Sequence, residues 1–120
     1  RVRLVGKQEP SAFYQHVQAF VQCSRYEGYG MTLIEAALSG LPIVTTDVGI
    51  VGEVLRDKEE VVVVPPSASH IAAALTRLSN DREFGTALGV RAKARVSLFQ
   101  KSEASYLEEY KAALLTCLSR

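Results

Sequence analysis

The sequence has little of what marks membrane, secreted or nucleic-acid-binding proteins. No apolar run approaches the roughly 20 residues that cross a bilayer, and residues 1–10 contain no signal-peptide core. The formal net charge is only +1, and Lys and Arg form no cluster, so charge gives no reason to expect nucleic acid or an anionic membrane as the main partner. We therefore expect a cytoplasmic protein without a transmembrane segment and without a nucleic-acid partner.

Cysteine, histidine and metal-binding motifs are also sparse. Cys23 and Cys117 are far apart in the chain and lack metal-ligand spacing, which predicts two free cysteines that behave as small, buried or half-buried hydrophobic residues. His16 and His70 lack such spacing too, and we expect both to be surface or helix-cap residues. No Asp-x-Asp motif occurs, so the sequence implies no bound metal ion.

What the chain does contain is enough apolar sequence for one compact domain. Of its 120 residues, 48% are hydrophobic and 22% are charged, a composition that can bury a core and remain soluble. Hydrophobic patterning and turn residues predict strands at residues 2–5, 19–23, 43–46 and 61–64. Helices are predicted at residues 11–16, 31–39, 52–56, 67–78 and 81–96, and from residue 101 onward.

This alternation of strands and helices predicts an α/β fold, a Rossmann-like parallel sheet with helices on both faces. The run of residues 61–64 is apolar throughout, which is typical of a strand buried in such a sheet. A complete doubly wound domain has about six strands, and only four are predicted here. We therefore expect residues 1–120 to be a single incomplete domain whose first strands lie outside the chain.

The loop of residues 24–30 is the candidate ligand site. It connects a predicted strand to a helix, and ligands of open α/β sheets bind beyond the carboxyl ends of the strands, where helix N-termini offer unpaired N–H groups. Gly28 and Gly30 would let the backbone turn and a ligand approach closely, so the N–H groups of Gly30, Met31 and Thr32 are expected to face a phosphate. The alternative is that these glycines only shape a structural turn.

Glu35 lies eight positions after Glu27, inside the apolar helix of residues 31–39. Gly40 and Pro42 end this helix, which is expected to pack on the sheet. A carboxylate in such a helix is costly unless it has a hydrogen-bonding partner or reaches the ligand crevice. The alternative is a position on the solvent face, where most helical glutamates lie.

These residues together resemble a known family signature. Residues 27–30 (EGYG), 33–36 (LIEA) and 40–44 (GLPIV) resemble the E-x7-E signature of retaining GT-B glycosyltransferases of group 1, or family 4. Residues 19–24 (AFVQCS) resemble the strand and serine that precede this signature. The resemblance extends over most of the chain and implies the carboxyl-terminal, donor-binding domain of a GT-B enzyme.

The resemblance also implies roles for individual residues. Glu27 would be catalytic, contacting the donor sugar or stabilising charge at its anomeric carbon, and Glu35 would accept hydrogen bonds from the ribose hydroxyl groups. The donor-binding residues would be Ser24, Gly28, Tyr29, Gly30, Met31, Thr32 and Glu35. The donor would be a UDP- or GDP-sugar with no further cofactor and no metal. The product would keep its anomeric configuration.

The acceptor would be a glycan, a lipid-linked molecule or a small molecule, held by an N-terminal domain outside the chain. That domain could also provide peripheral membrane contact. The family's donor-phosphate Arg and Lys would lie before residue 1, and Lys7 is interpreted as a solvated loop residue. The family often has two adjacent glycines after the third strand, whereas this sequence has only Gly49 there.

Other functions on the same architecture remain alternatives. A sugar-nucleotide epimerase would use the same fold, although the spacing of Glu27 and Glu35 favours transfer. A non-catalytic nucleotide-sugar-binding domain is a second alternative. A receiver-like or flavodoxin-like domain lacks support, because no acidic cluster and no Ser/Thr-rich phosphate loop follows the first predicted strand.

Overall fold

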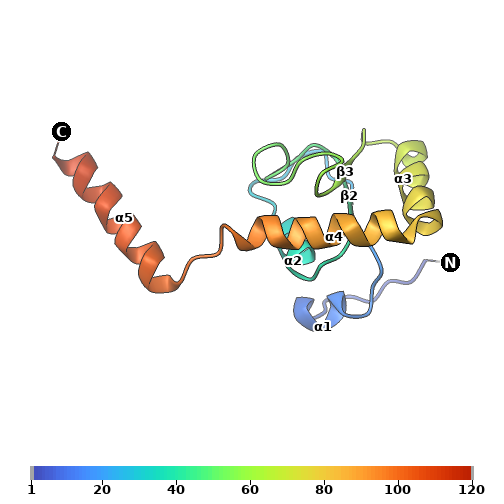
Figure 1. Ribbon diagram of the computed structural model, residues 1–120, viewed down its shortest axis with the longest axis horizontal. Helices are drawn as coiled ribbons and strands as arrows, with labels where there is room; N and C mark the ends of the chain where they lie inside the picture. Colours follow the sequence, from blue (N-terminus) through green and yellow to red (C-terminus); the bar gives the residue numbers. More distant parts are fainter. Residues whose placement is uncertain (1, 120) are drawn as a thin grey trace.

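A computed structural model describes residues 2–119 (Figure 1). The elements follow the chain as α1 (Pro10–Tyr14), β1 (Phe20–Gln22), α2 (Met31–Leu38), β2 (Ile43–Thr45), β3 (Val62–Val63), α3 (Ala68–Asn80), α4 (Arg82–Ser97) and α5 (Glu103–Leu118). The three strands form one sheet in the order β1-β2-β3. Both strand pairs are parallel, with Phe20 opposite Ile43 and Val44 opposite Val62. The predicted parallel α/β fold is therefore confirmed.

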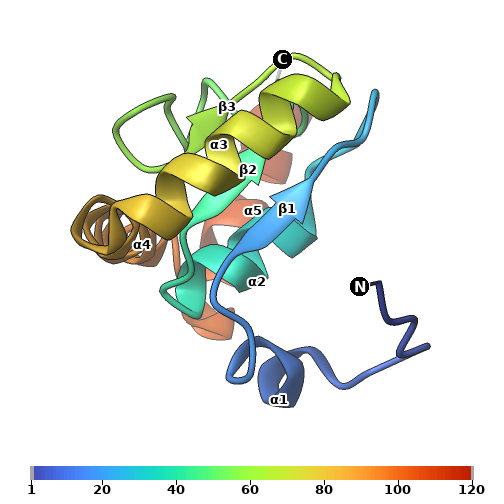
Figure 2. The same cartoon turned by 90° about the vertical axis from the view of Figure 1, so that its right-hand side faces the viewer.

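Helices cover both faces of this sheet (Figure 2). On the central strand β2, Ile43 belongs to a core cluster with α2 and the second half of α4, while Val44 belongs to a cluster with α3 and Leu88 of α4. Successive strand residues point to opposite faces, so one fully buried strand supplies both cores. The carboxyl ends of β1 and β2 meet at one edge because the strands are parallel.

The end of α2, the start of α4 and the buried side of α3 agree with the sequence predictions. Helix α2 is followed by Gly40 at φ +74°, with Gly40 N–H donating to Ala37 O and Leu41 N–H to Ala36 O, the hydrogen-bond pattern of a Schellman motif. Asp81 caps α4 by accepting a hydrogen bond from Phe84 N–H. Helix α3 buries Ala74 and Leu78, two of the residues predicted to face the core.

The amino-terminal elements differ from the prediction. Residues 2–5 form no strand, and the side chains of Val2 and Leu4 are exposed. A short β-prone segment needs a neighbouring strand to hydrogen-bond with, and these residues pair with none in the described part of the chain. Helix α1 begins after Glu9 with Pro10 in its first turn, instead of being capped by Ser11, because proline is well suited to that position.

Two further predictions around β3 are corrected. No helix forms at residues 52–56: residues 52–54 form a turn, and Val51 bridges to Leu55. Gly52 adopts φ +86°, a left-handed conformation that interrupts a helix. The strand predicted at residues 61–64 is reduced to Val62–Val63, and both residues are half-buried because β3 lies at the edge of the sheet.

Helix α4 packs closely against Gly40, the glycine that follows the carboxyl end of α2. Gly89 is buried in α4, and a Cβ atom there would lie 2.1 Å from the carbonyl oxygen of Gly40 and 2.9 Å from its carbon. Gly85, one turn earlier, has space, since its Cβ would lie 3.5 Å from Leu78 and 3.8 Å from Pro42. Gly89 is therefore required by contact, whereas Gly85 is not.

Helix α5 lies apart from the rest of the molecule (Figure 1). The helix itself is confirmed, but its predicted apolar side does not pack, and none of its residues is buried. The exposed residues include Leu107, Tyr110, Leu114 and Leu118. Cys117 on this helix is exposed, as is Cys23 at the end of β1, so the prediction of buried cysteines is wrong for both.

Candidate functional site

The loop of residues 24–30 begins directly after β1 and is tied down by two side chains. Ser24 Oγ donates a hydrogen bond of 2.6 Å to Glu27 Oε1, which closes the first half of the loop. Thr46, the residue after β2, donates from its hydroxyl to the carbonyl oxygen of Ser24. Both contacts lie at the carboxyl ends of neighbouring parallel strands. The loop that carries Glu27 is therefore anchored to the sheet, and one oxygen of that carboxylate remains free to accept other donors.

Two glycine turns meet where α2 begins. Gly30 is the N-cap of α2 at φ +84°, and Gly49, in the loop after β2, has φ +58°. A Cβ on Gly49 would lie 2.7 Å from the carbonyl oxygen of Tyr29 and 3.2 Å from the Cα of Gly30. The two loops thus touch backbone to backbone. Gly28 has no neighbour within 4 Å of such an atom, so no protein contact requires a glycine there.

This contact predicts a difference between two glycines that both have positive φ. Gly49→Ala should destabilise the chain by about 3 kcal/mol, because left-handed strain is added to a clash with Tyr29. Gly52→Ala is the matched control, since its Cβ would meet nothing within 4 Å and only the strain of about 1–2 kcal/mol applies. Urea unfolding followed by circular dichroism measures both, and equal costs would contradict the close approach described here.

The first turn of α2 contains the N–H groups that the sequence assigns to a phosphate. Leu33 N–H donates to the carbonyl of Gly30. The N–H groups before it in the chain, those of Gly30, Met31 and Thr32, lie at the start of the helix, where N–H groups have no partner within the helix. Thr32 Oγ1 donates a hydrogen bond of 2.7 Å to Gln22 Oε1 on β1. Gln22 is buried, and its Nε2 has no partner among the described residues. The turn is therefore fixed to the sheet through this pair, and Met31 and Tyr29 beside it are exposed.

Glu35 is half-buried on α2 and does have a hydrogen-bonding partner. Tyr14, at the end of α1, donates from its hydroxyl to Glu35 Oε2 at 3.3 Å. Burial of Tyr14, followed by the charge and hydrogen bond of Glu35, raises the pKa of this tyrosine above its usual range. Glu27 and Glu35 thus receive hydrogen bonds from different elements, one from its own loop and one from α1.

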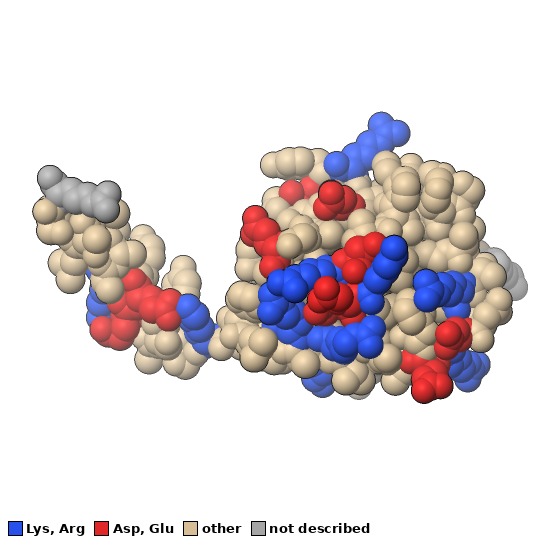
Figure 3. Space-filling view, turned by 45° about the horizontal axis from the view of Figure 1, so that its top comes forward, with Lys and Arg blue, Asp and Glu red and all other residues tan. Residues whose placement is uncertain are grey.

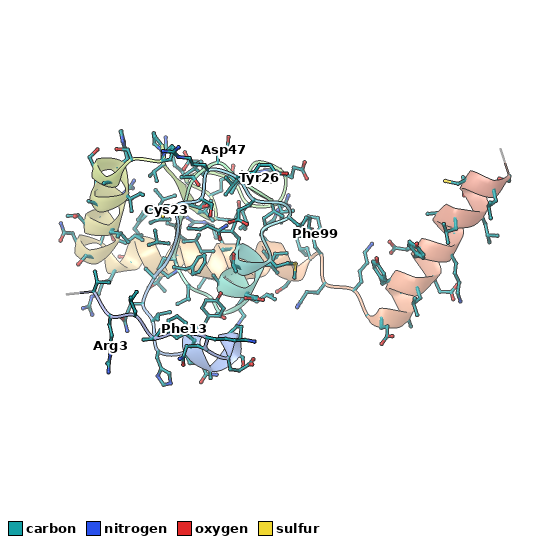
Figure 4. All side chains as sticks on the ribbon, turned by 180° about the vertical axis from the view of Figure 1, so that it is seen from behind. Arg3, Phe13, Cys23, Tyr26, Asp47 and Phe99 are labelled. Carbon is teal, nitrogen blue, oxygen red and sulfur yellow. The ribbon has the colours of Figure 1, made fainter. Side chains whose placement is uncertain are left out.

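A hollow of about 410 Å³ lies at the carboxyl ends of all three strands. Residues 24–25, 46–48 and 63–66 form its wall. Of the predicted donor-binding residues, only Ser24 is among them. Figure 4 marks this end of the body with Tyr26 and Asp47, on the side away from Phe13 of α1. Sequence reasoning missed most of the wall, although each segment lies at or just after the carboxyl end of a predicted strand, which is the signal that identifies it.

A larger hollow of about 610 Å³ lies at the opposite end of the sheet. Residues 17–19 and 40–42 line it together with the end of α3 and the start of α4. It contains none of the predicted site residues, and ligands of parallel sheets bind at the carboxyl ends of the strands. The smaller hollow is therefore the candidate site.

Charges of both signs share the face of the molecule that Figure 3 shows. On the face shown in Figure 3, Lys and Arg side chains are interspersed with Asp and Glu. Arg56 pairs with Glu59, and both are exposed. His16 and His70 are exposed, as predicted. Within residues 2–119, no helix is long and apolar enough to cross a membrane, and no three side chains group as a metal site would require.

Comparison with known proteins decides the family. The family model described as "Glycosyl transferases group 1" matches residues 1–95. The chain belongs to the group 1 glycosyltransferases. The match includes the sheet, the loop of residues 24–30 and most of α4, whereas α5 lies beyond it.

Individual group 1 relatives are much longer than this chain. A probable sucrose-phosphate synthase 2 from rice, Oryza sativa, is 32% identical over 99 residues, which cover 82% of this chain and 10% of that protein. The GtfA subunit of a UDP-N-acetylglucosamine–peptide N-acetylglucosaminyltransferase from Streptococcus pneumoniae is 32% identical over 71 residues, 58% of this chain and 14% of that protein. This group 1 chain thus spans a small part of the curated relatives it matches.

The solved structures agree on the fold. A sucrose-phosphate synthase from Thermosynechococcus elongatus superimposes with a TM-score of 0.78 and 26% sequence identity, covering 92% of this chain and 28% of that one. Its similarity identifies the architecture as that of a GT-B glycosyltransferase, of which the present chain forms a part.

Proposed function

We propose that this chain is the donor-binding part of a retaining glycosyltransferase, an enzyme that transfers a hexose-type residue from a UDP- or GDP-sugar to a glycan, lipid-linked or small acceptor. Membership of the group 1 family carries the proposal. The hollow at the carboxyl ends of the strands supports it, because this is where parallel α/β sheets bind nucleotides. The acceptor site belongs to a further domain in this proposal.

The first turn of α2 is the proposed phosphate site. Its free N–H groups and the positive end of the helix dipole suit a diphosphate, which becomes more negative as the sugar departs. The contacts of Gly49 with Tyr29 and of Thr32 with Gln22 hold this turn in place before a ligand binds. Such preorganisation stabilises the leaving group without a rearrangement during the reaction.

The two carboxylates have separate proposed roles. Glu27 stabilises positive charge at the anomeric carbon, and its hydrogen bond from Ser24 fixes the loop that presents it. Glu35 accepts the ribose hydroxyl groups. No metal takes part, and positioning of the donor and stabilisation of the departing diphosphate supply most of the catalysis.

The test uses the complete enzyme with labelled UDP- and GDP-sugars and a panel of acceptors. We expect release of the nucleoside diphosphate together with an acceptor product whose new linkage keeps the anomeric configuration of the donor, as NMR of the product would measure. An inverted linkage would overturn retention. An epimerised donor without acceptor product would identify an epimerase, and binding without turnover would identify a non-catalytic domain.

A further inference from the structure

Tyr14 joins α1 to Glu35 of α2, a residue that the proposed function assigns to the donor and that does not line the hollow at the strand ends. It is the only buried residue of α1, and its hydroxyl donates to Glu35 Oε2 across a separation of 21 residues in sequence. Its ring meets Phe20 of β1 edge-on, with centroids 5.9 Å apart and planes at 78°, and meets Phe13 at 6.3 Å and 64°. These contacts hold the ring in one orientation.

Packing of the aromatic ring does not explain why residue 14 carries a hydroxyl group. Phenylalanine would make the same edge-to-face contacts, whereas the hydroxyl of a buried tyrosine requires a hydrogen-bonding partner. Glu35 is that partner, and within residues 2–119 Tyr14 is the only side chain that donates to this carboxylate. The ring of Tyr14 packs α1, and its hydroxyl group contacts the Glu35 carboxylate.

The consequence for Glu35 is a fixed carboxylate. A glutamate side chain on a helix has several rotamers, and binding a ligand through it requires that freedom to be lost. The hydrogen bond to Oε2 removes part of this freedom in advance and leaves Oε1 with its lone pairs. Burial and the neighbouring carboxylate raise the pKa of Tyr14, so the phenol keeps the proton that it donates.

We propose that Tyr14 is a positioning residue for the donor nucleotide, holding Glu35 Oε2 so that the carboxylate is oriented to accept the hydroxyl groups of ribose. The inference rests on the proposed function, in which Glu35 binds ribose. Tyr14 itself does not touch the donor. Its effect is therefore confined to ligands that carry the ribose hydroxyl groups.

The experiment measures this selectivity in the complete enzyme. Isothermal titration calorimetry compares UDP or GDP, whichever binds more tightly, with its 2′-deoxy and 3′-deoxy forms. The proteins are the wild type, Tyr14→Phe, Glu35→Gln and the double variant. Tyr106→Phe is the matched control, since it removes the same hydroxyl group from an exposed tyrosine of α5. Circular dichroism checks that each variant is folded.

We expect Glu35→Gln to abolish most of the preference for the ribose form and Tyr14→Phe to reduce it by about three- to tenfold, the usual effect of one hydrogen bond. The double variant should match Glu35→Gln, and Tyr106→Phe should match the wild type. If Tyr14→Phe leaves the preference for the ribose form unchanged, the inference is overturned. An equal loss of affinity for the ribose and deoxyribose forms would then indicate a purely structural tyrosine.

Failure of the proposed function has a different signature. If neither nucleoside diphosphate binds and no sugar is transferred, the proposed function fails together with the inference. If sugar transfer is intact but Glu35→Gln leaves the ribose preference unchanged, glycosyl transfer stands while the roles of Glu35 and Tyr14 are both rejected.

Discussion

Replacing Glu27 by glutamine should lower kcat for sugar transfer by about 10²–10³-fold in the complete enzyme, the usual cost of removing one group that stabilises charge in a transition state. Glutamine keeps the size of the side chain and can still accept the hydrogen bond from Ser24 Oγ. The loop should therefore keep its shape. Affinity for the nucleoside diphosphate should change by less than about threefold, because this ligand lacks the sugar that the Glu27 carboxylate would contact.

Steady-state kinetics and calorimetry separate these two effects. Glu103→Gln is the matched control, because Glu103 is an exposed residue of α5 outside the family match, and its kcat should equal that of the wild type. Unchanged transfer by Glu27→Gln would remove this residue from the catalytic role. A loss of nucleotide affinity as large as the loss of kcat would assign Glu27 to ground-state binding instead.

The largest expected effect on stability is that of Gly89→Ala, which should destabilise the chain by at least about 3 kcal/mol. Its Cβ would lie 2.1 Å from the carbonyl oxygen of Gly40, so α4 must move away from the carboxyl end of α2. Both contacting groups are backbone and cannot rotate aside. Separating these helices would expose Ala36 and Ala92 in the shared core.

Gly85→Ala provides the comparison within the same helix. Its Cβ meets only ordinary contacts of 3.5–3.8 Å, and alanine favours a helix over glycine by up to about 1 kcal/mol. Gly85→Ala should therefore be neutral or slightly stabilising in urea unfolding. If both substitutions had the same effect, the contact between Gly89 and Gly40 would not control the packing of α4.

The parts of the fold that the sequence predicted correctly are those with local signals. Helix α2 was predictable because helix-forming residues are followed by Gly40 and Pro42, and Asp81 marked the start of α4 in the same way. Residues 2–5 also carried a local strand signal, and no strand forms there. Strand propensity alone does not supply the neighbouring strand on which a ladder depends.

The candidate site was only partly predictable for the same reason. The loop of residues 24–30 was identified by its glycines, whereas the wall of the hollow is assembled from three loops that are distant in sequence. Glu35 was predicted to need a partner because it lies in an apolar helix, and Tyr14 fulfils that need. No local pattern could name Tyr14, since contacts between α1 and α2 depend on how the sheet brings them together. Whether Glu27 and Glu35 bind the donor stays a prediction.

Helix α5 contributes no buried residue, it lies away from the sheet (Figure 1), and none of its residues lines either hollow. Single substitutions in residues 103–118 are therefore expected to leave the stability of the sheet domain and the shape of its ligand crevice unchanged in urea unfolding and nucleotide titration.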